Sequence, residues 1–192
     1  MAGHKKDRES GGRDSVADDP EVRARHVCLR LLTLAPRTRS QLAEALRKRG
    51  IPDEVAEDVL GRFADVGLID DAAFARAWVE SRHYSRGLAG RALSAELKQR
   101  GVAAEEIRAA IAEQLGPDAE ISAARGLVER KLAGTRGLPP EQRTRRLAGM
   151  LARKGYPAGL SFRVIREALE AEGSGATPEE EPPSDYDDPD TE

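Results

Sequence analysis

Basic side chains are the groups in this sequence best suited to chemistry with a partner. Residues 21–176 hold 27 bases and 21 acids, although the whole chain has a formal net charge of −3. A basic body is compatible with a phosphate-bearing partner, because arginine and lysine pair with phosphate oxygens. Charge alone does not establish such a partner, but seven bases in the middle and last parts of the chain are the candidates for contact: Arg82, Arg86, Arg91, Lys98, Arg145, Arg146 and Arg153.

The end of the sequence has the opposite charge. From Thr177 to Glu192 there are eight acids and no base. This composition is typical of a disordered end that keeps a protein soluble. A second interpretation is that the acidic segment mimics a polyanion and competes for the basic surface.

No residues have the spacing of a catalytic, metal or nucleotide site. His4, His26 and His83 are far apart in the sequence, and His83 stands among arginines, so we expect it at the surface. The single cysteine, Cys28, falls beside an apolar stripe and is expected in the core. We therefore expect no enzyme activity, no cofactor and no metal.

The composition favours helices. Charged residues make up 34% of the chain and aromatic residues only 4%, and there is no run of β-branched residues. No stretch approaches the roughly 20 apolar residues that span a bilayer, and the first twenty residues lack the apolar region of a signal peptide. We expect a monomeric, cytoplasmic protein that does not bind membranes.

An internal repeat organises the chain. The phrase LRKRGIP recurs as LKQRGVA and LARKGYP, with a period of about 50 residues that is typical of repeat proteins. The three phrases contain Gly50, Gly101 and Gly155. A helix that ends in a Schellman motif takes a glycine with positive φ just past its cap, and the next residue packs back on the helix. We expect each of the three glycines to end a helix in this way.

Each repeat is predicted to contain three amphipathic helices, because its apolar residues follow the helical period. In the last repeat, Phe162, Ile165 and Leu169 form one such stripe. The predicted helices cover residues 23–34, 38–49 and 53–66, then 70–84, 88–100 and 104–115, then 118–133, 140–154 and 159–171. The predicted organisation is a disordered tail (1–22), three repeats (23–69, 70–116 and 117–172) and a disordered acidic tail (173–192).

The stretch GLIDDAAFARAWVESR combines a helix start with the largest apolar side chains of the middle repeat. Asp70 is predicted to cap the helix, and Asp71 to place a negative charge in its first turn. Phe74, Ala77 and Trp78 would share one buried face of this helix.

The alternative is a DNA-binding protein, either sequence-nonspecific or a helix-turn-helix transcriptional regulator. Residues 38–69 resemble a winged helix, with two helices joined by a turn and a Gly-Leu-Ile exit. However, the helix that would read DNA, residues 53–63, carries four acids and one base, and its carboxylates would repel phosphates. The residues after Gly-Leu-Ile also have a helical pattern, where a wing needs a β-hairpin.

The sequence as a whole resembles the RecX family of regulators of the RecA recombinase. The resemblance covers nearly all of residues 23–171. Its most specific part is the series Gly-Leu-Ile-Asp-Asp, Phe-Ala, Trp and Arg within residues 67–82. The sequences Glu-Leu and Arg-Gly-Val within residues 96–102 add to it. The long acidic tail is not part of the family pattern.

This resemblance implies an all-α, curved and elongated molecule of three tandem three-helix repeats. It also implies binding in the helical groove of the RecA–single-stranded DNA filament, with inhibition of ATP hydrolysis and strand exchange. The second helix of each repeat is basic, and the third helices of the first two repeats are acidic. We expect stacked repeats to present a basic and an acidic stripe, and the seven bases to contact recombinase or DNA.

Overall fold

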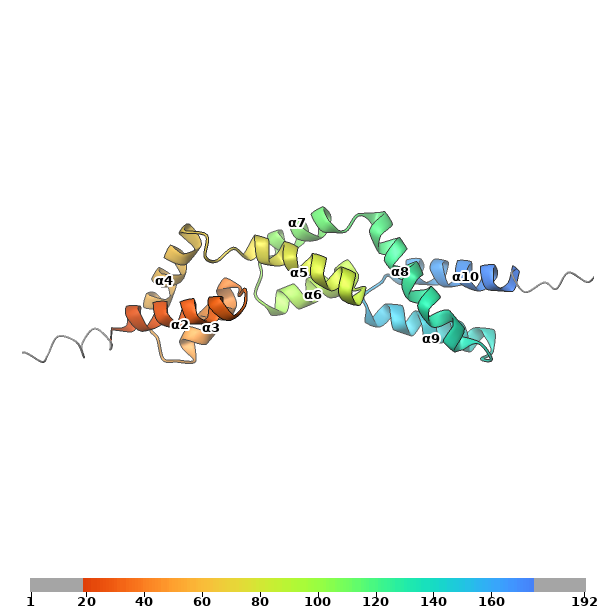
Figure 1. Cartoon of the computed structure of the whole chain (residues 1–192), viewed down its shortest axis with the longest axis horizontal. Coiled ribbons are helices and arrows are strands. Elements are labelled where there is room, and N and C mark those ends of the chain that lie inside the picture. The colour runs from red at the N-terminus through yellow and green to blue at the C-terminus, as the bar shows by residue number, and fades with distance from the viewer. Residues whose placement is uncertain (1–18, 175–192) are drawn as a thin grey trace, which may run out of the picture.

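The computed structural model describes residues 19–174, which form nine α-helices, a short 3-10 helix and no strand. The helices follow one another in an elongated row of three groups (Figure 1). The first repeat contains α2 (Pro20–Leu34), α3 (Arg39–Arg47) and α4 (Asp53–Asp65). The second repeat contains α5 (Asp71–Arg86), α6 (Gly90–Gln99) and α7 (Ala104–Gln114). The third contains α8 (Pro117–Leu132), a 3-10 turn (Ala133–Thr135), α9 (Pro140–Arg153) and α10 (Ala158–Ser174).

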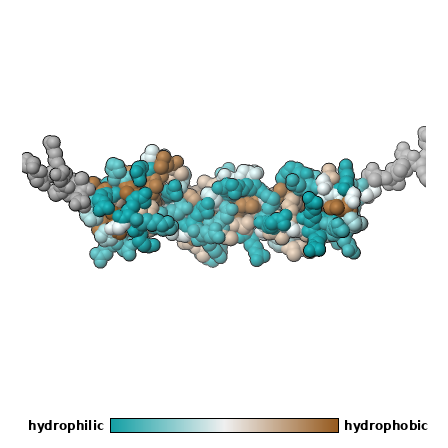
Figure 2. Space-filling model, turned by 90° about the horizontal axis from the view of Figure 1, so that it is seen from below, coloured by the Kyte–Doolittle hydropathy of each residue, from teal (hydrophilic) through white to brown (hydrophobic). Residues whose placement is uncertain are grey.

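This architecture confirms the predicted all-α fold of three tandem three-helix repeats. Seen from below, the row runs nearly straight, so the expected curvature is slight in that direction (Figure 2). The first helix begins at Pro20, three residues earlier than predicted, because the Asp19 carboxylate accepts a hydrogen bond from the Glu21 amide at 2.9 Å. Residues 173 and 174, predicted to belong to the disordered acidic tail, are the last residues of α10, and the rest of the two predicted disordered tails lies outside the described residues.

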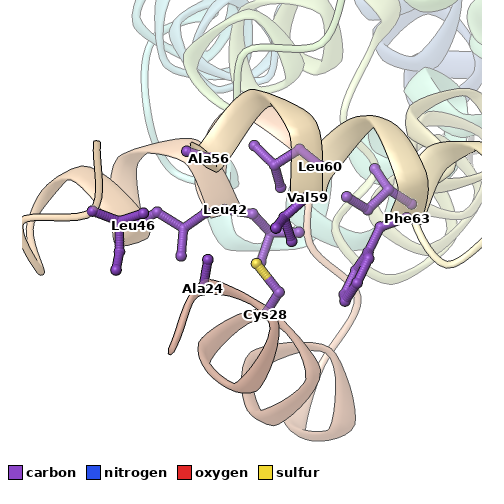
Figure 3. Close-up of a cluster of buried hydrophobic side chains, with 10 residues drawn as sticks. Ala24, Cys28, Leu42, Leu46, Ala56, Val59, Leu60 and Phe63 are labelled. Atoms are coloured by element: carbon purple, nitrogen blue, oxygen red, sulfur yellow. The ribbon is translucent and has the colours of Figure 1, made fainter. Parts of the chain in front are cut away.

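Each repeat has its own small hydrophobic core. In the first repeat, Cys28 of α2 points into a cluster with Leu42 of α3 and Val59 of α4 (Figure 3), which confirms its predicted burial. The other two clusters are centred on Leu93 and Leu97 in the second repeat and on Leu147, Leu151 and Ile165 in the third. The main helix–helix contacts all lie within a repeat, so the repeats meet through other parts of the chain.

The predicted buried face of α5 is only partly right. Ala75, Val79 and His83 are the buried residues of this helix, whereas Phe74 and Trp78 are only partly buried and Ala77 is exposed. The small side chains of Ala75 and Val79 pack against the second-repeat core, and the two aromatic rings lie at its edge.

The predicted stripe of α10 also needs correction, at one position. Phe162 is 54% exposed, whereas its neighbour Ser161 is buried. The Ser161 hydroxyl donates a hydrogen bond to the Pro157 carbonyl at 3.0 Å, so burial leaves it satisfied. Ile165 is buried and Leu169 packs against the third core, as predicted.

The three glycine turns have the predicted Schellman geometry. Gly50, Gly101 and Gly155 have φ of 72°, 77° and 88°, a region that other residues enter only with strain. The residue after each glycine donates its amide to the carbonyl five residues earlier: Ile51 to Leu46, Val102 to Leu97 and Tyr156 to Leu151, at 3.1–3.2 Å.

Two of these turns also join the repeats. A Cβ on Gly101 would lie 2.2 Å from Ser40 Cβ, and one on Gly155 would lie 2.6 Å from the Ala92 backbone nitrogen. Ser40 and Ala92 lie in the first turns of α3 and α6, the second helices of the preceding repeats. Gly50 has no preceding repeat, and a Cβ there would meet no atom within 4 Å.

Polar contacts complete both joints in a similar way. The residue before each glycine offers its carbonyl to the N-cap residue of the preceding second helix. Arg100 O accepts from Thr38 Oγ1 at 2.6 Å, and Lys154 O accepts from the Ala89 amide at 2.9 Å. We call the contact of Gly101 with the first repeat joint 1 and that of Gly155 with the second repeat joint 2.

A carboxylate from the next repeat caps the same helix end at each joint. Asp71 accepts from the first amide of α3, Arg39 N, at 2.9 Å. Glu120 of α8 accepts from the first amide of α6, Gly90 N, at 2.7 Å. Carboxylates at helix N-termini are stabilising because they meet free amides and the positive end of the helix dipole.

We predict that alanine substitution separates the two roles of these glycines. Gly50→Ala only places an alanine at a positive φ that is unfavourable for it, and it should lower the free energy of unfolding by about 1–2 kcal/mol. Gly155→Ala adds a clash with backbone and should cost clearly more, as measured by urea denaturation.

Gly101→Ala offers an internal control, because the atoms that it meets belong to the Ser40 side chain. The double variant Gly101→Ala/Ser40→Gly should lose less stability than the sum of the two single variants. Equal losses for the three glycine variants, together with additivity in the double variant, would contradict the close packing of the joints.

Candidate functional site

The seven bases that the sequence singles out are available for a partner. Six of them are exposed, and Arg82 is partly buried. None forms an ion pair with a carboxylate in the part of the chain that the structure describes. They lie in the second and third repeats, where their charges are not neutralised by close protein partners.

Two of the corresponding bases of the first repeat pair with carboxylates. Lys48 lies 2.6 Å from the Glu44 carboxylate, and Arg47 lies 3.8 Å from Asp53. The Arg49 guanidinium donates to the Ala45 carbonyl at 2.8 Å. Arg47 and Lys48 therefore have carboxylate partners among the described residues, whereas the seven selected bases have none, a difference that the sequence pattern alone does not reveal.

Joint 2 brings two of the predicted bases to one groove. Arg91 of α6 and Arg153 of α9 line a hollow of about 670 Å³ whose walls include the small residues Ala92 and Ala152. The exposed ring of Phe162 also lines it. Arg145 lies in an adjoining hollow that shares Phe162, and we call this surface the basic groove.

Arg86 lies in a second groove, between α5 and α8. Its lining includes Arg130 and Lys154, which the sequence analysis did not select, and the exposed Tyr84. Lys154 Nζ also donates to the Arg86 carbonyl across joint 2. Lys154 occupies the position before the turn glycine, so this base serves the joint as well as the helix dipole.

Lys98 and Arg146 are exposed on α6 and α9 and line neither of these two grooves. The structure therefore brings together Arg91, Arg145 and Arg153, and it leaves the other predicted bases apart from them.

Arg82 lies at joint 1, stacked on an aromatic ring. Its guanidinium carbon is 4.2 Å from the centroid of the Trp78 ring, and that of Arg100 is 3.8 Å from the same centroid. The Trp78 indole nitrogen donates to Glu96 at 2.8 Å, and the Phe74 ring stacks on Trp78 with centroids 5.7 Å apart. Such cation–π contacts hold the indole in place without burying it fully.

Histidine 83 is buried, contrary to the prediction of a surface position. It is 8% exposed, and its Nδ1 lies 2.9 Å from the Leu88 carbonyl. This hydrogen bond satisfies the ring nitrogen and allows burial.

The adjacent acids Asp70 and Asp71 cap two different helices. Asp70 accepts from the Ala73 amide at 2.7 Å and is the N-cap of α5, as predicted. Asp71 reaches across joint 1 to α3, and its burial raises the pKa of its carboxyl, an effect that the hydrogen bond from Arg39 opposes. No pattern in the sequence predicts this second cap.

Residues 19–174 contain no group of three or more His, Cys, Asp or Glu side chains that could hold a metal ion. None of the helices described is long and apolar enough to span a membrane.

Three family models match the chain in order. They describe the first, second and third three-helix domains of RecX and cover residues 24–63, 70–111 and 118–165. The chain belongs to the RecX family. Each match falls within one of the three helix groups of the structure.

Curated RecX relatives are similar over most of their length. The chain is 60% identical to a "Regulatory protein RecX" of Thermobifida fusca over 173 residues, 87% of this chain and 93% of the relative. It is 63% identical to that of Streptomyces coelicolor over 155 residues, 81% of this chain and 82% of the relative.

Two solved RecX structures share the fold. The structure of RecX from Lactobacillus salivarius superimposes with a TM-score of 0.73 at 16% identity, covering 80% of this chain and 99% of that one. A second, a "regulatory protein RecX", gives 0.70 at 22% identity, covering 87% and 81%. At these identities the similarity shows the architecture alone.

Proposed function

We propose that this RecX-family protein inhibits the RecA recombinase by binding in the groove of the RecA–single-stranded DNA filament. It would suppress ATP hydrolysis and strand exchange, and so regulate homologous recombination and DNA repair. The observation that carries the proposal is the set of free bases in the second and third repeats of an elongated body. An extended surface with uncompensated positive charge suits a filament that displays both protein and nucleic acid.

The proposed contacts are the seven bases of the sequence analysis, extended by Arg130 and Lys154 of the second groove. In the basic groove, small side chains would let a nucleic-acid strand approach closely. Exposed rings beside arginines, as at Phe162 and Tyr84, are also typical of surfaces that bind single strands.

The second candidate function is binding of free DNA without the recombinase, which the same bases and rings favour. The reading of α4 as a DNA-recognition helix is less well supported, because α4 carries Asp53 and Glu54 in its first turn. The residues that follow Ile69 form helix α5, where a winged helix would have strands.

Titration of RecA ATP hydrolysis on single-stranded DNA separates the two functions. We predict inhibition at amounts well below one molecule per RecA, and this inhibition should persist when DNA is in excess. Inhibition that extra DNA abolishes would support competition for free DNA instead, and no inhibition at all would overturn the proposal.

Reversal of two adjacent charges tests the proposed surface in the same assay. Arg145→Glu/Arg146→Glu should raise the concentration for half-inhibition roughly tenfold, because each reversed base turns attraction to phosphate into repulsion. Both side chains are exposed, so the melting temperature should change little.

The matched control is Arg47→Glu/Lys48→Glu, which reverses two adjacent bases at the end of α3. These bases already pair with Asp53 and Glu44, so we expect inhibition close to that of the unmodified protein. Equal effects of the two double variants would show that overall charge, and not this surface, governs inhibition.

A further inference from the structure

Exposed apolar side chains gather on the first repeat. Six large apolar side chains stand out as exposed in residues 19–174, and four of them belong to this repeat: Leu29, Leu34, Val66 and Leu68. Figure 2 shows apolar surface toward this end of the row. Of these four side chains, only Leu68 also lines a groove at joint 1.

A groove of about 520 Å³ lies beside this surface, at joint 1. The α2–α3 segment contributes Leu32 and Pro36, the turn after α4 contributes Leu68, and α5 contributes Phe74 and Trp78. Its lining is mostly apolar, unlike that of the second groove, which contains three bases.

The aromatic wall of the joint 1 groove is preorganised. Trp78 is fixed by its hydrogen bond to Glu96 and by the guanidinium groups of Arg82 and Arg100. A rigid, half-exposed indole next to arginine is typical of the residues that dominate protein–protein binding, because little conformational freedom is lost when a partner covers it.

Two arginines at this groove can receive an anionic group. Arg82 lines it and forms no ion pair within residues 19–174. Arg37 also lines it, and its Nε is buried without a hydrogen-bond partner among the described residues. A buried donor without a partner is unfavourable, and an oxygen atom of a bound molecule would satisfy it.

A polypeptide fits this groove better than a nucleic acid. Most of the lining residues are apolar, Asp70 is also among them, and the neighbouring helix α4 carries several carboxylates. In the first repeat, Arg47 and Lys48 are also paired with carboxylates and are less free to attract phosphates.

We infer that the joint 1 groove binds a polypeptide segment with an apolar side chain next to a carboxylate. The apolar side chain would pack on Leu68, Phe74 and Trp78, and the carboxylate would meet Arg37 and Arg82. We assign this segment to the RecA polypeptide, and this assignment rests on the proposed function. The joint 1 groove, including Arg82, would then contact protein, while the other six bases of the sequence analysis contact nucleic acid.

Binding of RecA without DNA or nucleotide tests this assignment. The full chain is immobilised, and RecA is titrated over it and over two single variants. Leu68→Asp should weaken binding at least tenfold, because it places a charge on the apolar wall. Leu68 is 49% exposed, so this change should leave the fold intact, which far-UV circular dichroism would check.

Leu34→Asp is the matched control. Leu34 is more exposed, at 75%, and belongs to the same repeat, but it does not line the groove. We expect this variant to bind RecA as the unmodified chain does. Equal weakening by both variants, or unchanged binding by Leu68→Asp, would overturn the inference.

ATP hydrolysis measured in parallel distinguishes the two proposals. A protein that inhibits hydrolysis but does not bind DNA-free RecA would retain the proposed function and lose the groove assignment. A protein that fails to inhibit, yet binds DNA-free RecA in a manner that only Leu68→Asp weakens, would retain the groove and lose the proposed function.

Discussion

At each joint, a glycine turn lies directly against a helix of the preceding repeat. The absence of a side chain at Gly101 and Gly155 allows both a positive φ and an approach that a Cβ would block. At the same helix end, a backbone carbonyl of the following repeat accepts a hydrogen bond from the N-cap residue, and a carboxylate of that repeat accepts one from the first helical amide. Because the main helix packing stays within repeats, these few contacts decide how the repeats are placed along the row.

The joints also organise the surfaces that a partner would meet. Joint 2 holds Arg91 and Arg153 on one groove and Arg86 and Lys154 on another. Joint 1 surrounds Trp78 with arginines and opens an apolar groove beside the first repeat. The same turns that connect the repeats therefore separate a mainly apolar surface from a mainly basic one.

The sequence predicts the parts of this structure that follow local rules. The positions of the helices follow from the helical period at which apolar residues recur. The Schellman turns follow from a glycine flanked by two apolar residues at fixed spacing. The joints could not be predicted, because they pair residues such as Thr38 and Arg100, which are 62 positions apart and carry no shared pattern. The same limit applies to the ion pairs of Arg47 and Lys48 in the first repeat. The burial of α5 was mispredicted because large side chains suggest a core, whereas the space between helices there accepts Ala75 and Val79.

The proposal that the joints set the geometry for filament binding can be tested with two glycine variants. Inhibition of RecA ATP hydrolysis would be measured for Gly50→Ala and Gly155→Ala, at a temperature where circular dichroism shows both fully helical. We predict that Gly50→Ala inhibits like the unmodified protein, because its turn touches no other repeat. Gly155→Ala should need a clearly higher concentration, since its clash displaces the third repeat from the second. Equal inhibition by the two folded variants would contradict this role of the joints.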